Sequence, residues 1–124
     1  SLETAALAAL NAQRGQSGQA ALSCDAKALA AARAHSQDMC SNGFAGHTGS
    51  DGSTISSRLH KAGASFSSAS QSVAKGFSSG SAVVGGWMGS PGNRQVLLDP
   101  RWRRAAIGAI SCSGGTRWTA VVLY

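Results

Sequence analysis

The sequence predicts an α+β domain in which helices cover a β-sheet. Two helix-favouring stretches open the chain, and two β-prone runs joined by a glycine-containing turn close it. Helices that come first and strands that come last are typical of a sheet packed against helices. The chain has 124 residues, of which 43% are hydrophobic and 13% charged. This length and composition predict one folded domain over residues 1–124.

The first third of the chain contains two predicted helices. Residues 2–14 combine regularly spaced leucines with many alanines, and glycines follow them. A second helix is expected to begin near Asp25, because aspartate is a preferred helix N-cap. It continues through residues 27–39 and ends at Asn42-Gly43, since glycine commonly terminates helices.

The middle of the chain is predicted to be largely irregular. Residues 44–80 are rich in Gly and Ser, and only a short helical stretch near residues 55–61 interrupts them. A long irregular span in a compact domain often carries function. We expect Phe66 and Phe77 to anchor it, because few other apolar contacts would offset the entropy lost when it orders.

The last third of the chain is predicted to contain a helix and a hairpin. Residues 81–88 fit a third helix because their apolar side chains recur at helical spacing, and residues 96–98 form a short apolar run. Residues 105–111 and 118–124 are β-prone, with a turn at residues 113–116 between them. No internal repeat is present.

The charge balance favours anionic partners in general, and nothing in it points to nucleic acid in particular. Eleven Lys and Arg against five Asp and Glu give a net charge of +6. Arg101, Arg103 and Arg104 cluster around Trp102, which we expect in the core. The cluster is either a solubilising surface or a contact for an anionic surface. No recognised nucleic-acid motif accompanies it.

The cysteines predict one disulfide and one free thiol, because Cys24, Cys40 and Cys112 are odd in number and form no CxxC pair. Cys24 and Cys40 flank the second predicted helix, which separates them by roughly 24 Å. A disulfide tolerates only about 7 Å between Cα atoms, so these two are not expected to pair. We favour Cys24–Cys112, with Cys40–Cys112 as the alternative.

A series of segments, in order along the chain, resembles the CAP superfamily of cysteine-rich secretory, antigen 5 and pathogenesis-related class 1 proteins, in its short bacterial and fungal form. The resemblance implies an α-β-α sandwich with a central antiparallel sheet flanked by helices. The matching segments are Leu10-Asn11-Ala12-Gln13-Arg14 (LNxxR), Ala34-His35-Ser36-Gln37-Asp38-Met39, Gly43-Phe44-Ala45-Gly46-His47-Thr48 (NGFFSHT), Asp51-Gly52-Ser53-Thr54 with Arg58-Leu59 (DGxTxxxRL), Trp87-Met88-Gly89-Ser90-Pro91-Gly92-Asn93-Arg94 (WMxSPGHR), Val96-Leu97-Leu98-Asp99-Pro100 (NILNP) and Ile107-Gly108 (IGVG).

The resemblance also implies a cleft with two His and two Glu side chains that can bind Zn²⁺. His47 occupies the first His position. Gln71 and Asn93 replace the Glu of the GENI segment and the His of PGH, and Ser90 replaces the second Glu. Neutral amides are poor zinc ligands, although they still donate and accept hydrogen bonds. We therefore expect a polar pocket of His47, Gln71, Ser90 and Asn93, without a metal or other cofactor.

The function we expect is that of a secreted, extracellular and monomeric binding protein without catalytic activity. The resemblance implies a sterol or other lipid, a cell-wall glycan or a host protein as partner. The alternative is a metal-independent extracellular hydrolase, acting on cell-wall polysaccharide or peptide through His47 and a nearby acid such as Asp51. The residue before the first predicted helix is Ser1 in place of an initiator Met, which is compatible with removal of a signal peptide. Of the other histidines, His35 is expected to be structural and His60 exposed.

Overall fold

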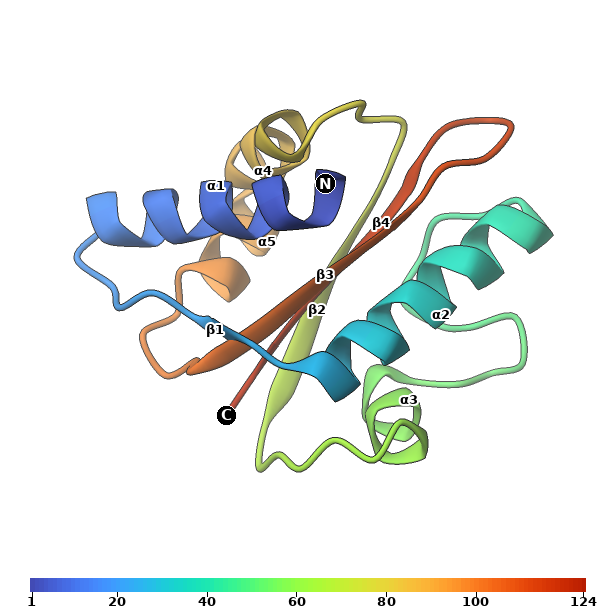
Figure 1. The fold of residues 1–124 in the computed structure, drawn as a ribbon, viewed down its shortest axis with the longest axis horizontal. Helices are drawn as coiled ribbons and strands as arrows, with labels where there is room; N and C mark the ends of the chain where they lie inside the picture. The colour runs from blue at the N-terminus through green and yellow to red at the C-terminus, as the bar shows by residue number, and fades with distance from the viewer.

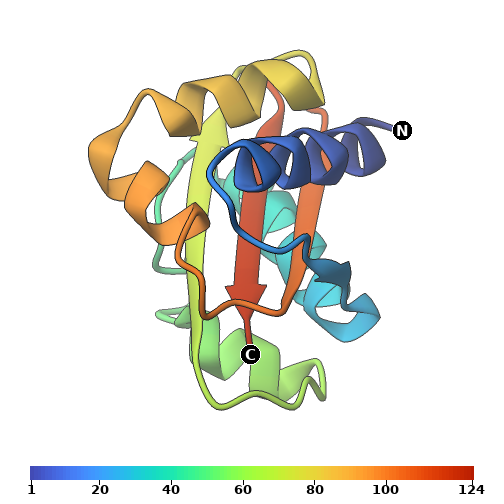
Figure 2. The same ribbon diagram turned by 90° about the vertical axis from the view of Figure 1, so that its left-hand side faces the viewer.

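The computed structural model, which describes residues 1–124, has three layers: two groups of helices with a β-sheet between them (Figures 1 and 2). One face of the sheet is covered by α1, α4 and α5, and the other by α2 and α3. The α-β-α sandwich implied by the resemblance is thus confirmed. The helices are α1 (Leu2–Gln16), α2 (Ala26–Asn42), α3 (Ile55–Lys61), α4 (Gly80–Met88) and α5 (Pro91–Leu97). None of them is long and apolar enough to cross a membrane.

The sheet has the order β1-β3-β4-β2, and its three long strands are antiparallel. The short β1 adds a parallel edge, because Ser23 pairs with Arg104 of β3. The sheet is therefore mixed, although its main part is antiparallel as expected. The strands are β1 (Ser23–Cys24), β2 (Ala69–Lys75), β3 (Arg104–Ile110) and β4 (Arg117–Leu123).

Local sequence signals account for the helix ends. The carboxylate of Asp25 accepts a hydrogen bond from the backbone N–H of Ala28, as expected of an N-cap. Gly43 ends α2 in the left-handed conformation (φ 67°), which glycine adopts without steric cost. The predicted hairpin is formed by β3 and β4.

Three elements lie where the sequence did not predict them, and the first is the two-residue strand β1. The strand β2 falls within residues 44–80, which we expected to be irregular apart from α3. The helix α5 occupies residues for which only a short apolar run at 96–98 was predicted. It begins at Pro91, whose fixed φ and missing N–H suit the first position of a helix.

The core is split between the two faces of the sheet, and all three tryptophans are buried in the half beneath α1 and α4. Each indole N–H donates to a backbone carbonyl, as buried tryptophans require. Trp102, for example, donates to the carbonyl of Val96 at 2.7 Å. The phenylalanines of the Ser-rich span also pack as expected: Phe66 contacts the core half below α2, and Phe77 the half below α1.

The disulfide joins Cys40 to Cys112, so the favoured Cys24–Cys112 pairing was wrong. Cys40 lies in the last turn of α2, beside the β3–β4 turn that carries Cys112, and their Cα atoms are 6.0 Å apart. Cys24 pairs with Ala105 near the start of β3, at the opposite end of that strand. A seven-residue strand spans roughly 23 Å. This distance separates Cys24 from Cys112 and is too long for a disulfide. Cys24 is the free, exposed thiol.

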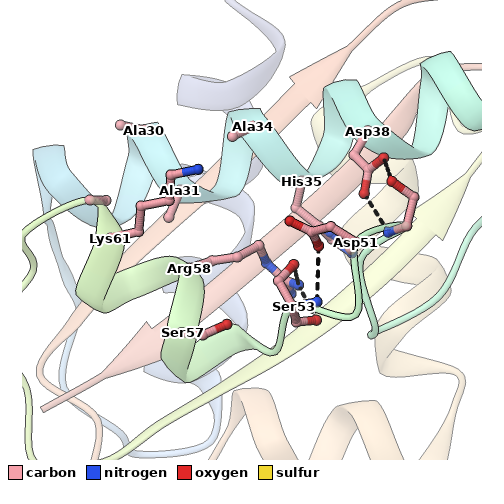
Figure 3. A pocket seen from close by; sticks show the side chains of 12 residues that line it. Ala30, Ala31, Ala34, His35, Asp38, Asp51, Ser53, Ser57, Arg58 and Lys61 are labelled. Carbon is pink, nitrogen blue, oxygen red and sulfur yellow. Dashed lines mark hydrogen bonds between the residues drawn. The ribbon is translucent and has the colours of Figure 1, made fainter.

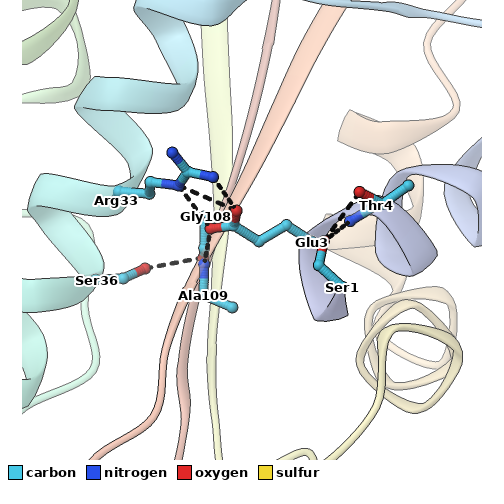
Figure 4. Close-up of polar contacts among 7 residues, drawn as sticks. All are labelled: Ser1, Glu3, Thr4, Arg33, Ser36, Gly108 and Ala109. Atoms are coloured by element: carbon cyan, nitrogen blue, oxygen red, sulfur yellow. Dashed lines mark hydrogen bonds and ion pairs between the residues drawn. The ribbon is translucent and has the colours of Figure 1, made fainter.

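Glu3 of α1 ties the strand β3 to both helical layers (Figure 4). Its carboxylate accepts the backbone N–H of Ala109 in β3 at 2.9 Å and pairs with Arg33 of α2. Ser36 of α2 donates to the carbonyl of Gly108 at 3.0 Å. These contacts fix the positions of α1 and α2 relative to β3.

Candidate functional site

His47, Gln71, Ser90 and Asn93 line one pocket, with a volume of about 460 Å³. They reach it from three separate parts of the chain. His47 lies in the loop before α3, Gln71 lies on β2, and Ser90 and Asn93 lie at the start of α5. The Ser90 residue precedes Pro91 as the N-cap of this helix. The four positions taken from the resemblance are therefore close in space.

Gln71 is the best-fixed side chain of this pocket, with 7% of its surface exposed. Its Nε2 donates to the backbone carbonyl of His47 at 3.0 Å, and its Oε1 accepts from Nη2 of Arg58 at 3.1 Å. The same Nη2 donates to the His47 carbonyl at 3.0 Å. Gln71 and Arg58 together fix the loop that carries His47, a role that the sequence motifs did not reveal.

The residues present do not fit a zinc ion. Zinc prefers three or four imidazole, thiolate or carboxylate ligands, and no three His, Cys, Asp or Glu side chains lie together where they could hold a metal. His47 is the one imidazole of the pocket, and both amide atoms of Gln71 already have partners within the protein.

The acid required by a hydrolase is also not in contact with His47. No carboxylate forms a hydrogen bond with its imidazole. Asp51 accepts the backbone N–H of Ser53 at 2.9 Å, and Asp38 accepts that of Ser50 at 2.8 Å. A histidine that acts as a general base is usually oriented by such an acceptor, and here that orientation is lacking.

A second and larger pocket, of about 590 Å³, lies between α2, α3 and the loop that joins them (Figure 3). Sequence reasoning did not identify this pocket. The signal was present in part, because Ala30, Ala31 and Ala34 leave a shallow face on α2. We name it the α2–α3 pocket, and its lining residues are Ala30, Ala31, Ala34, His35, Asp38, Ser50, Asp51, Ser53, Ser57, Arg58, Lys61 and Ala62.

His35 lies on the inner wall of the α2–α3 pocket with 1% of its surface exposed, in the structural role we expected. Its Nε2 is 2.7 Å from the carbonyl of Gly46. A carbonyl can only accept, so Nε2 carries the proton and the buried Nδ1, which has no partner, is unprotonated. Burial lowers the pKa of His35; the Gly46 carbonyl opposes this, and the charge of Arg58 adds to it.

Stability is expected to fall as the pH is lowered from about 7 to 5.5, because the unfolded state binds a proton at His35 near pH 6.5 and the folded state does not. The free energy of unfolding, measured by urea denaturation across this range, should decrease in the parent. In His35→Gln the slope should be flatter, whereas the control His60→Gln, altered on an exposed residue, should keep the parental slope. Equal slopes in the parent and His35→Gln would contradict this assignment.

The arginine cluster is separate from both pockets, and each of its members has a partner within the protein. Arg101 pairs with Asp99 at 2.8 Å, and Arg104 pairs with Asp25. Arg103 donates to the carbonyl of Pro100 at 2.8 Å. Contact with an anionic surface through this cluster stays a prediction.

The fold has three layers of helix, sheet and helix. A polar pocket lies between β2, α5 and the loop before α3. This combination is that of a CAP domain, also called an SCP domain. A sequence model of the CAP family, described as the cysteine-rich secretory protein family, matches residues 7–124. The chain belongs to this family.

Two curated relatives from Bacillus subtilis (strain 168) show similarity over part of their length. The uncharacterized protein YkwD is 30% identical over 109 residues, which is 88% of this chain and 42% of the relative. The uncharacterized membrane protein YlbC is 30% identical over 98 residues, or 79% of this chain and 28% of the relative. The chain thus spans less than half the length of both.

Solved structures show the same fold. An extracellular protein containing an SCP domain from Bacillus anthracis matches with a TM-score of 0.89 and 24% identity, over 98% of this chain and 39% of that one. An outer surface protein from Borrelia burgdorferi matches with a TM-score of 0.86 and 19% identity, over 94% of this chain and 87% of that one. The architecture is therefore retained at low sequence identity.

Proposed function

We propose that this protein is an extracellular CAP domain that binds a neutral cell-wall carbohydrate in the pocket of His47, Gln71, Ser90 and Asn93 and leaves it chemically unchanged. One observation supports this ligand class above the others. No Asp, Glu, Lys or Arg is among the residues that line the pocket, whereas hydroxyl, amide and imidazole groups are. Uncharged donors and acceptors beside small apolar side chains suit the hydroxyl groups and ring faces of a sugar.

Several observations support an extracellular location. The family is described as secretory, and two structural neighbours are named as an extracellular and an outer surface protein. The Cys40–Cys112 disulfide fits an oxidising compartment, since cytosolic thiols are usually kept reduced.

The surface gives less support to a lipid or sterol as ligand. Tyr124 is the one large hydrophobic side chain that is exposed. The α2–α3 pocket has an alanine floor, but charged side chains of both signs also line it. Burial of an acyl chain or sterol requires a continuous apolar surface. The lack of an acid on His47 similarly favours binding over hydrolysis.

The proposal is tested by titrating the protein with chitotetraose, a neutral oligosaccharide of N-acetylglucosamine, under NMR observation. We expect amide shifts at His47, Ser70, Ser90, Gly92 and Asn93. Asn93→Ala should weaken binding about tenfold, the effect of losing one or two hydrogen bonds. The control Gln95→Ala, on the same helix but outside the pocket, should bind like the parent.

The same samples distinguish carbohydrate binding from hydrolysis and from lipid binding. Recovery of intact oligosaccharide after long incubation is expected, and shortened products would show a hydrolase. Absence of shifts at millimolar oligosaccharide would overturn the carbohydrate proposal. A sterol or a fatty acid that shifts these amides under the same conditions would replace it with a lipid ligand.

A further inference from the structure

The α2–α3 pocket collects charges of both signs. The sequence has only five Asp and Glu residues, and two of them, Asp38 and Asp51, line this pocket together with Arg58 and Lys61. The three ion pairs of the molecule all lie elsewhere, at Glu3, Asp99 and Asp25. The four charged side chains therefore face one pocket without neutralising one another in ion pairs.

Two of these charges belong to the walls of the pocket. Both carboxylate oxygens of Asp38 accept hydrogen bonds, from Asn42 and from the hydroxyl and backbone N–H of Ser50. Arg58 donates through Nη1 to Ser53 and through Nη2 to Gln71 and the His47 carbonyl. Asp38 and Arg58 thus hold the loop over the pocket and have little capacity left for a ligand.

The loop needs a glycine to reach this arrangement. A Cβ at Gly49 would lie 2.8 Å from Oδ1 of Asp51 and 3.4 Å from Oδ2 of Asp38, and closer still to the hydroxyl of Ser53. Gly49 therefore lets the loop bring the two carboxylates to one end of the pocket.

The other two charges are free. Asp51 accepts from Ser53 through Oδ1, and its Oδ2 has no partner. Lys61, at the end of α3, forms no hydrogen bond and no ion pair. In Figure 3, Lys61 lies opposite Ala31 and Asp51 lies opposite His35, one turn further along α2. One helical turn corresponds to roughly 5.4 Å.

We propose that the α2–α3 pocket binds a small zwitterionic ligand, a short peptide with free termini, whose ammonium group meets Asp51 and whose carboxylate meets Lys61. An isolated cation is disfavoured by Lys61 and Arg58, and an isolated anion by Asp38 and Asp51. A ligand that carries both charges satisfies both ends. A dipeptide spans about 7 Å between its termini, which is close to the separation along α2.

The floor of the pocket selects for small side chains. Ala30, Ala31 and Ala34 present methyl groups where larger residues would fill the space. Pockets of roughly 300–1,000 Å³ commonly hold small molecules, and a volume of about 590 Å³ accommodates a dipeptide with side chains of alanine size. Methyl groups of such a ligand would bury apolar surface against this floor.

Asp51 has the ionisation that the proposed contact needs. Hydrogen bonds from Ser53 lower the pKa of its carboxyl group, and the charge of Lys61 lowers it further. Asp51 is therefore a carboxylate at neutral pH and can pair with an ammonium group. The proposal does not depend on the carbohydrate site, because the two pockets share no lining residue.

The test uses alanyl-alanine and two probes that each lack one charge, N-acetyl-alanyl-alanine and alanyl-alanine amide. We expect alanyl-alanine to shift the NMR amide signals of residues 50–53 and 57–62. Each blocked probe should bind at least about tenfold more weakly, since it lacks one charge-assisted contact.

Three variants locate the binding. Asp51→Asn keeps an acceptor for Ser53, and Lys61→Gln removes the charge from an exposed residue while keeping a polar side chain, so both should remain folded. Each should weaken alanyl-alanine binding about tenfold, and the control Lys75→Gln, on an exposed residue outside the pocket, should not. No shift at about 10 mM alanyl-alanine, roughly ten times a Kd of 1 mM, would overturn the proposal. Equal binding of the blocked probes, or parental affinity in both pocket variants, would overturn it as well. None of these outcomes bears on the carbohydrate site.

Discussion

Replacing Cys40 and Cys112 together by alanine is expected to lower the free energy of unfolding by about 4 kcal/mol. The disulfide joins two residues 72 positions apart, the end of α2 and the β3–β4 turn. A cross-link over so long a loop removes many conformations from the unfolded chain, so its loss stabilises the unfolded state. Guanidinium denaturation followed by circular dichroism measures this change as a large decrease in the midpoint.

Cys24→Ser is the matched control, because Cys24 is exposed and unpaired. It should leave the midpoint unchanged. Reduction of the parent by dithiothreitol should produce the same decrease as the double alanine variant, since both remove one cross-link. A double variant that unfolds at the parental midpoint would show that the cross-link contributes little, and a large effect in Cys24→Ser would point to a different pairing.

The elements predicted correctly are those whose ends are determined locally. Asp25 caps α2 through the N–H of Ala28, and Gly43 ends it in a left-handed conformation. Both signals lie within a few residues of the feature that they determine. The β3–β4 hairpin is similarly local, since a short turn joins its two strands.

The strand β2 could not be predicted in this way, because its sequence lacks a run of β-branched residues. Gln71 and Ser72 are buried polar residues on it. The strand is held by its pairing with β4, from Ala69 with Leu123 to Lys75 with Arg117. That partner lies far along the chain, and local propensity carries no information about it.

The same distinction applies to the pockets and to the disulfide. The positions of His47, Gln71, Ser90 and Asn93 followed from ordered motifs, and the structure places them around one pocket. The hydrogen bonds of Gln71 to the His47 carbonyl and Arg58 depend on the path of a loop, which the motifs do not specify. Likewise, Cys112 had two candidate partners until the end of α2 was placed beside the hairpin turn.

Gly80→Ala is expected to destabilise the protein by about 3 kcal/mol, a typical upper value for overpacking. Gly80 is the first residue of α4 and lies against the backbone of α1. A Cβ there would lie 2.7 Å from the carbonyl carbon of Ala5 and from the Cα of Ala6. The hydrogen-bonded backbone of a helix cannot move aside as a side chain can, so α1 and α4 would have to separate. Thermal and urea denaturation should both report the loss.

Gly85→Ala is the control within the same helix and should have the opposite sign. Gly85 is exposed, and a Cβ there meets nothing within 4 Å. Alanine favours the helix over glycine by about 0.5–1 kcal/mol, so this variant should be slightly more stable than the parent. The pair separates the intrinsic helix preference, which favours alanine at the interior position of Gly85, from the close approach of α4 to α1, which only Gly80 permits. If Gly80→Ala were as stable as Gly85→Ala, the two helices would be further apart than the structure places them.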